Sequence, residues 1–258
     1  MNTISYSPLQ LRELFHLEVL RRLAQKLKPG HYALKGGVNM RFFFGSPRYS
    51  EDMDLDAQIV AGHALRDVVM AIVTSPSLQE ALASFGVRSI VAPDIGKAKQ
   101  TETTQRFKIH LITSSGEDMF TKIEFSRRGI KAGVAVETVR ADILKALRLP
   151  PLMCPHYGAE AAMLQKIDAI AGRTVTQARD IFDLFLLTTQ ARLSKKLLNR
   201  KDSDILAKAT KNVYRVEFDQ FRDTVIPYFP EADRALYNDS SRWDEIRLTV
   251  SRCMEELV

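Results

Sequence analysis

The sequence predicts a protein of the α+β class, with an N-terminal domain that mixes strands and helices (residues 1–150) and a helical C-terminal domain (residues 151–258). Three observations support this division. Short runs that alternate apolar and polar residues, as strands do, are confined to the first half. Apolar residues at helical spacing dominate from residue 141 onward. Pro150 and Pro151 break a helix near the boundary.

The N-terminal domain opens with a helix, because Ser7 supplies a hydroxyl N-cap and Pro8 suits the first helical position. Apolar residues then recur at helical spacing until the Pro29-Gly30 pair. A short apolar segment at 32–34 leads into a short helix over 38–44. The remaining elements expected in this domain are a strand over 52–60, helices over 62–74 and 77–85, and strands over 87–92, 106–113 and 119–125.

The C-terminal domain is expected to contain helices over 157–171, 176–190, 203–213 and 240–257. Trp243 and the aromatic run 42–44 are interpreted as core or interface residues. The five histidines have no spacing typical of a metal site, so we interpret them as structural.

Composition excludes several classes of protein. Two cysteines are too few for a disulfide framework and lack the spacing of a zinc site. No segment approaches 18 apolar residues, and the start of the chain lacks the basic and apolar regions of a signal peptide. We therefore expect a cytoplasmic protein that is not bound to a membrane.

The net charge of +6 is concentrated in one segment. Residues 192–215, the basic segment, contain eight Lys or Arg and two Asp, a net charge equal to that of the whole chain. Such a cluster is a candidate site for RNA phosphates, although a solvated helical face would look the same. The candidate RNA-binding residues are Lys195, Lys196, Arg200, Lys201, Lys208 and Lys211.

The segment 52–56, Asp-Met-Asp-Leu-Asp, carries the clearest chemical signal. Successive side chains of a strand face opposite ways, so Asp52, Asp54 and Asp56 share one face. Carboxylates packed this closely repel each other, and Mg²⁺ would neutralise them while binding substrate phosphates. A solvated strand edge is the alternative interpretation. We predict that Asp52 and Asp54 are metal ligands.

Two further features support this prediction. Gly36 and Gly37 open a helix whose free N–H groups could hold a triphosphate. Glu124 lies on another predicted strand and could complete a two-metal site or act as a base. A cross-strand ion pair is the alternative role for Glu124.

A second group of charged residues lies in the helical half. Lys166 and Arg173 can point to one side of their helix, and Asp180 and Asp183 are neighbours on the next. The two cations could stabilise the charge on the leaving phosphates. The alternative is a buried salt-bridge network between helices that joins the two domains.

Together these motifs resemble the AbiEii/AbiGii family of nucleotidyltransferase toxins. The resemblance covers about residues 30–190 and rests on the ordered pair of motifs, one around 35–55 and one around 166–184. It implies a polymerase-β-like fold with a mixed sheet, use of a nucleoside triphosphate with Mg²⁺, and a neighbouring antitoxin as partner. It also implies that Asp52 and Asp54 hold metal. The nucleotide-binding candidates are Lys35, Gly36, Gly37, Ser50 and Arg173; the catalytic candidates are Asp52, Asp54, Glu124, Lys166, Asp180 and Asp183.

The resulting hypothesis is a toxin that transfers a nucleoside monophosphate to an acceptor and releases pyrophosphate. The resemblance implies that the acceptor is the 3′ end of a tRNA. Two alternatives stay open: the same chemistry directed at a protein hydroxyl, and a binding module for RNA or protein that keeps the fold without catalysis.

Overall fold

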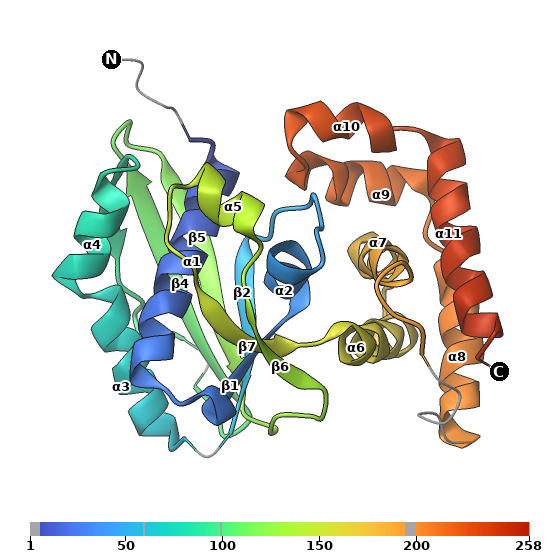
Figure 1. The fold of residues 1–258 in the computed structure, drawn as a ribbon, viewed down its shortest axis with the longest axis horizontal. Coiled ribbons are helices and arrows are strands. Elements are labelled where there is room, and N and C mark those ends of the chain that lie inside the picture. The colour runs from blue at the N-terminus through green and yellow to red at the C-terminus, as the bar shows by residue number, and fades with distance from the viewer. Residues whose placement is uncertain (1–5, 59, 99, 194–199, 258) are drawn as a thin grey trace. The chain divides into compact units, whose positions relative to one another are not determined.

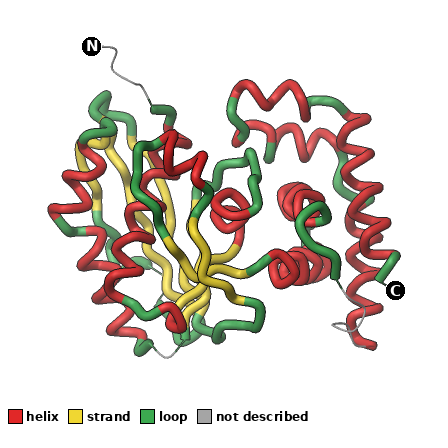
Figure 2. The backbone as a smooth tube through the Cα atoms, viewed as in Figure 1, coloured by secondary structure: helices red, strands yellow, loops and turns green. Residues whose placement is uncertain are grey.

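A computed structural model describes residues 6–58, 60–98, 100–193 and 200–257 (Figure 1). The chain forms two compact units. Unit 1 comprises residues 1–43 and 49–157, and unit 2 comprises residues 44–48 and 158–258. Unit 1 contains the sheet, whereas the part of unit 2 that is described consists of helices and loops (Figure 2).

Unit 1 alternates helices and strands along the chain. Its elements are α1 (Pro8–Lys26), η1 (Pro29–His31), β1 (Tyr32–Lys35), α2 (Gly36–Phe43), β2 (Asp52–Ala57), α3 (Gly62–Val73), α4 (Pro76–Ala83), β3 (Val87–Val91), β4 (Thr104–Thr113), β5 (Asp118–Ser126), β6 (Val134–Thr138), α5 (Ala141–Ala146) and β7 (Met153–Tyr157).

The seven strands form one mixed sheet in the order β3-β4-β5-β2-β1-β7-β6. The β2–β5 and β1–β7 pairs are parallel, and the remaining pairs are antiparallel. The predicted acidic strand β2 therefore lies in the middle of the sheet, between β5 and β1. This position brings residues of two neighbouring strands, β5 and β1, beside its carboxylates.

Helix α1 begins as its sequence predicts. The Ser7 hydroxyl accepts a hydrogen bond from the backbone N–H of Gln10, and the Gln10 side chain accepts one from the N–H of Ser7, which forms a capping box. The helix packs on β5, and its buried face includes Leu14, Phe15 and Leu17. These residues belong to the core that also holds the inward face of β2.

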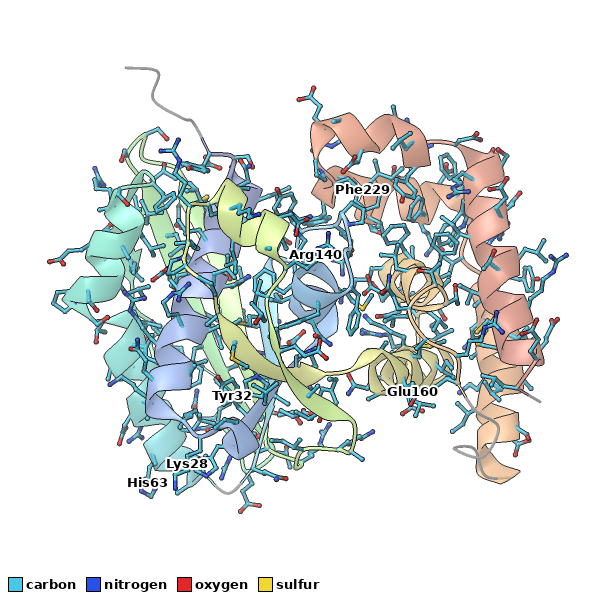
Figure 3. All side chains as sticks on the ribbon, viewed as in Figure 1. Lys28, Tyr32, His63, Arg140, Glu160 and Phe229 are labelled. Atoms are coloured by element: carbon cyan, nitrogen blue, oxygen red, sulfur yellow. The ribbon has the colours of Figure 1, made fainter. Side chains whose placement is uncertain are left out.

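Unit 2 is built around an aromatic core. Phe182 packs against Phe221, Phe229 and Tyr237, with ring centroids 5.2–5.7 Å apart, and Trp243 stacks on Phe221 at 4.4 Å. Phe229 is labelled in Figure 3. The elements of unit 2 are α6 (Ala159–Gly172), α7 (Ala178–Leu187), α8 (Arg200–Val213), α9 (Phe218–Thr224), η3 (Ile226–Tyr228), α10 (Glu231–Tyr237) and α11 (Ser240–Glu255).

The structure confirms the predicted fold class, a mixed sheet with many helices, and adds elements that the sequence did not reveal. Strands β6 and β7, and the short helices α9 and α10, were not predicted. Four of the five β7 residues are buried, so this strand lacks the alternation that identifies a half-exposed strand. The predicted boundary lies at residues 149–151, whereas the units divide between Tyr157 and Gly158, because β7 pairs with β1.

Candidate active site

Strand β2 carries the predicted acidic face. Met53 and Leu55 are fully buried in the core, and Asp52 and Asp54 lie on the other side of the strand, where they are partly accessible. The register places Asp54 directly beside Glu124 of β5. The sequence prediction that these three carboxylates come from neighbouring strand positions is therefore confirmed in geometry.

Two of these carboxylates already have a cationic partner. Lys122 Nζ lies 3.0 Å from Asp52 Oδ2, and Arg106 Nε lies 2.7 Å from Glu124 Oε2. The cross-strand ion pair, the alternative role for Glu124, is thus present. Both pairs are partly exposed to solvent, which screens them and lowers what each contributes to stability.

Asp54 differs from both. Among the residues that the structure describes, none forms a hydrogen bond or an ion pair with its carboxylate. Burial raises the pKa of Asp54; Lys122 partly lowers it again, and the Glu124 carboxylate adds to the rise. A half-buried carboxylate without a bonded cation loses part of its hydration, and a bound cation would compensate for that loss.

Gly36 brings the start of α2 against Asp54. Its φ of +70° is a left-handed conformation that residues with a Cβ rarely adopt. A Cβ at this position would also lie 3.0 Å from Asp54 Oδ2. Two independent constraints therefore favour glycine at position 36: its left-handed backbone, and the short distance that a Cβ would have to the Asp54 carboxylate.

The third carboxylate of the strand face, Asp56, has a structural role. Lys35 Nζ lies 2.5 Å from Asp56 Oδ1, and the Tyr157 hydroxyl donates a hydrogen bond of 2.6 Å to Asp56 Oδ2. Asp56 thus ties together β2, β1 and β7. The ammonium of Lys35, a predicted nucleotide contact, forms this ion pair with Asp56.

Ser50 holds the start of β2 together with Thr121, which no sequence pattern indicated, and His16, which was interpreted as structural. The Ser50 hydroxyl donates to the backbone carbonyl of Asp52, at 2.9 Å. The Thr121 hydroxyl donates to the carbonyl of Glu51, at 2.7 Å, and lies 3.0 Å from His16 Nε2. Because the Thr121 proton is used, His16 must donate to Thr121. A polar pair between α1 and β5 has no local sequence signal.

Asn39, two residues after the Gly-Gly pair, anchors α2 to the sheet. Its amide donates to the carbonyl of Tyr157, at 2.9 Å, and its oxygen lies 2.9 Å from His156 Nδ1. The His156 ring is stacked on Phe43, with centroids 3.5 Å apart. The structural interpretation of His156 is confirmed.

Unit 2 contains the second predicted group as a buried network. Lys166 Nζ lies 2.9 Å from Asp180 Oδ1 and 2.6 Å from Asp183 Oδ2, and Arg173 Nε lies 2.9 Å from Asp180 Oδ2. Arg48 adds a further contact, 3.3 Å from Asp183 Oδ2. The inter-helix salt-bridge network that we considered as an alternative is therefore formed between α6 and α7.

The network favours the charged forms of Lys166 and Asp180. Burial works against the charged form of Lys166, but the carboxylates of Asp183 and Asp180 outweigh it and raise the pKa of the ammonium. Burial likewise opposes ionisation of Asp180, yet Lys166 and Arg173 keep the pKa of Asp180 below its ordinary value. The assignment of these four side chains to the nucleotide site stays a prediction.

The donor set of β2 suits a cation that brings other ligands with it. In the described ranges no three His, Cys, Asp or Glu side chains converge as a ready metal cluster. Mg²⁺ commonly takes only one or two protein carboxylates and completes its shell with water and substrate phosphates. Asp54 without a bonded cation, with Asp52 on the same face, fits this arrangement. Glu124 contacts Arg106 through Oε2, so its Oε1 could join this arrangement.

The predicted RNA-binding residues are only partly described. Lys195 and Lys196 lie outside the described residues, and the side chains of Arg200 and Lys201 are not described. Lys208 and Lys211 are exposed on α8. RNA binding by Lys208 and Lys211 stays a prediction.

Comparisons with known proteins agree with the geometry. Residues 18–246 match the family described as nucleotidyl transferase AbiEii toxin of type IV toxin–antitoxin systems. The match covers most of the chain, so the protein belongs to this family. A comparison with curated proteins finds no significant match.

Solved structures show the same fold at low identity. JHP933 from Helicobacter pylori is 19% identical, with 98% of this chain and 93% of that chain covered and a TM-score of 0.57. MenT4, a nucleotidyltransferase toxin from Mycobacterium tuberculosis, is 16% identical, with coverages of 97% and 93% and a TM-score of 0.60. A putative nucleotidyltransferase from H. pylori is 19% identical, with coverages of 98% and 96% and a TM-score of 0.52.

The protein is thus a nucleotidyltransferase, of the AbiEii toxin type, from a type IV toxin–antitoxin system. Family membership removes the alternative of a binding module without catalysis. Within the described ranges, none of the helices has the length and hydropathy needed to cross a lipid bilayer.

Proposed function

We propose that the protein transfers a nucleoside monophosphate from a nucleoside triphosphate to the 3′ end of a tRNA, with Mg²⁺ as the metal. The acceptor hydroxyl attacks the α-phosphorus, the bond from that phosphorus to the bridging oxygen breaks, and pyrophosphate leaves. The acceptor proton passes to a base, for which Glu124 is the candidate. When bound, Mg²⁺ would neutralise the phosphates and lower the pKa of the attacking hydroxyl.

One observation carries this proposal: Asp54 is a half-buried carboxylate with no bonded partner among the described residues, and Gly36 keeps the space beside it free. Asp52 and Asp54 would hold the metal. The N–H groups at the start of α2, at Gly36 and Gly37, would bind phosphate oxygens. Ser50 would act by holding the backbone of Asp52 in place.

Unit 2 supplies further candidates for phosphate charge. We propose that Lys166 and Arg173 stabilise the charge on the phosphates. Asp180 and Asp183 would orient the side chains of Lys166 and Arg173. Their buried ion pairs support the orienting role. An antitoxin encoded as the partner of a type IV system would oppose the activity without being needed for it.

The test is a labelling assay on the full chain. The protein is mixed with Mg²⁺, each labelled nucleoside triphosphate in turn, total tRNA and total protein, beside Asp52→Asn as the inactive control. We expect label in a tRNA-sized band and none with the variant. Label in a protein band would support the protein-hydroxyl alternative. Absence of label with every nucleotide and several divalent ions would contradict the proposal.

A further inference from the structure

A second site lies in unit 2, on the surface between the end of α6 and α8. A pocket of about 390 Å³ is lined there by residues of the α6–α7 loop, the C-terminal half of α8 and the start of α9. Three cations contribute to its wall: Arg173, Lys208 and Arg215. Among the described residues, no Asp or Glu lines the pocket, so its charged lining groups are all cations.

The cations are available to a ligand. Lys208 has no hydrogen bond or ion pair with any described residue. Arg215 donates to the Asn212 side-chain oxygen at 3.2 Å and has no acidic partner in the described ranges. Arg173 contacts Asp180 through Nε, which fixes its position while both terminal nitrogens remain as donors.

The neutral wall adds hydrogen-bonding groups. Thr174, Thr176, Asn212 and Gln220 line the pocket. Asn212 is buried, and its amide donates to the carbonyl of Ile170, at 2.9 Å, so it holds α8 against α6. The pocket is therefore formed by helices that pack together: Lys208 and Asn212 lie on α8, and Arg215 lies two residues after its end.

The described lining favours the sugar–phosphate backbone over the nucleobase. It contains no aromatic side chain, so a nucleobase would find no ring on which to stack. Cations, hydroxyls and amides without a stacking surface suit phosphate oxygens and ribose hydroxyls. A phosphodiester backbone carries phosphates and ribose hydroxyls in series. A neighbouring phosphate of that backbone could contact Lys211, which is exposed on α8.

We infer that this pocket seats the phosphodiester backbone of an RNA, through Arg173, Lys208 and Arg215, independently of base sequence. The inference rests on the proposed function, in which RNA is the acceptor, and gives that RNA a defined anchoring point. It also assigns Arg173 a second role, since this residue belongs both to the pocket and to the network of Asp180.

The test measures RNA binding by the full chain, without nucleotide, over a range of salt concentrations. The variant Lys208→Gln/Arg215→Gln removes two pocket charges. Its matched control, Lys26→Gln/Lys28→Gln, removes two exposed cations of unit 1; Lys28 is labelled in Figure 3. The probes are bulk tRNA, oligouridylate and oligoadenylate.

We expect the pocket variant to bind all three probes more weakly and to lower the slope of log affinity against log salt by about 1.4, or about 0.7 for each lost contact. The control should keep the slope of the unmodified chain. The single variant Lys208→Gln, at an exposed position, should show half the change and guards against misfolding of the double variant.

Three results would overturn the inference. An unchanged slope, with RNA binding retained, would reject the pocket and leave the proposed function intact. Weaker binding of one homopolymer only would show base recognition. If the unmodified chain bound no RNA, both the inference and the RNA acceptor would fail, whereas the labelling assay would still report transfer to protein.

Discussion

At the scale of single residues, Gly36 is the position where backbone and chemistry meet. We predict that Gly36→Ala abolishes nucleotide transfer, because the added Cβ would stand 3.0 Å from Asp54 Oδ2. It should also lower the free energy of unfolding by about 1–2 kcal/mol through the left-handed backbone. Transfer rate and urea unfolding measure the two effects.

Gly86→Ala is the matched control for this prediction. Gly86 also has a positive φ, +97°, but a Cβ there would meet nothing within 4 Å. The two variants should lose similar stability, and only Gly36→Ala should lose activity. Equal activity in both would show that the space beside Asp54 is not required.

His16 should make stability depend on pH. Burial, with a smaller contribution from Arg12, lowers the pKa of His16 to about 3, against 6.5 when unfolded. Its contribution to stability is therefore complete above pH 6.5 and is lost as the pH falls from there toward 3. The amide of His16→Gln can still donate to Thr121. Between pH 7 and pH 5, the free energy of unfolding of this variant should fall by about 2 kcal/mol less than that of the unmodified protein. Equal pH profiles in urea unfolding would refute this.

At the scale of elements, the link between α6 and α7 depends on Lys166. Lys166→Met would leave Asp180 and Asp183 buried with weaker compensation. Breaking a buried pair in this way costs about 3–5 kcal/mol. The exposed Lys208 of α8 is the comparison, since Lys208→Gln should change stability by less than about 0.5 kcal/mol. Thermal unfolding of both variants gives the answer, and a loss below 1 kcal/mol for Lys166→Met would contradict a structural role.

Local sequence patterns predicted the individual helices and strands better than they predicted which strands pair with each other. The alternation in β2 and the cap of α1 are local, and both were predicted. The strand β7 has no alternation, and Tyr157 reaches Asp56 across 101 residues of sequence. The carboxylate face was therefore predictable, whereas the pairing that separates Asp56 from Asp54 was not, because it depends on which strands become neighbours.

At the scale of the whole molecule, the division into units departs from the linear order of the chain. Residues 44–48, between α2 and β2, belong to unit 2, and Arg48 is buried there beside Asp183, 135 residues away in sequence. A cut at the predicted boundary near residue 150 would thus remove β7 from the sheet of unit 1. Because Arg48 precedes the cut in sequence, the cut would also separate Arg48 from the rest of unit 2.

The most direct test compares two carboxylates of one strand face, Asp54→Asn and Asp56→Asn, for nucleotide transfer and for stability. Because the pKa of Asp54 is raised, its ionised form is disfavoured in the folded state, so Asp54→Asn should unfold no more easily at neutral pH. Its transfer rate should fall by about a hundredfold or more. Asp56→Asn should lose about 1–3 kcal/mol of stability through Lys35 and keep its transfer rate within about tenfold. Full transfer by Asp54→Asn would show that this carboxylate does not hold the metal.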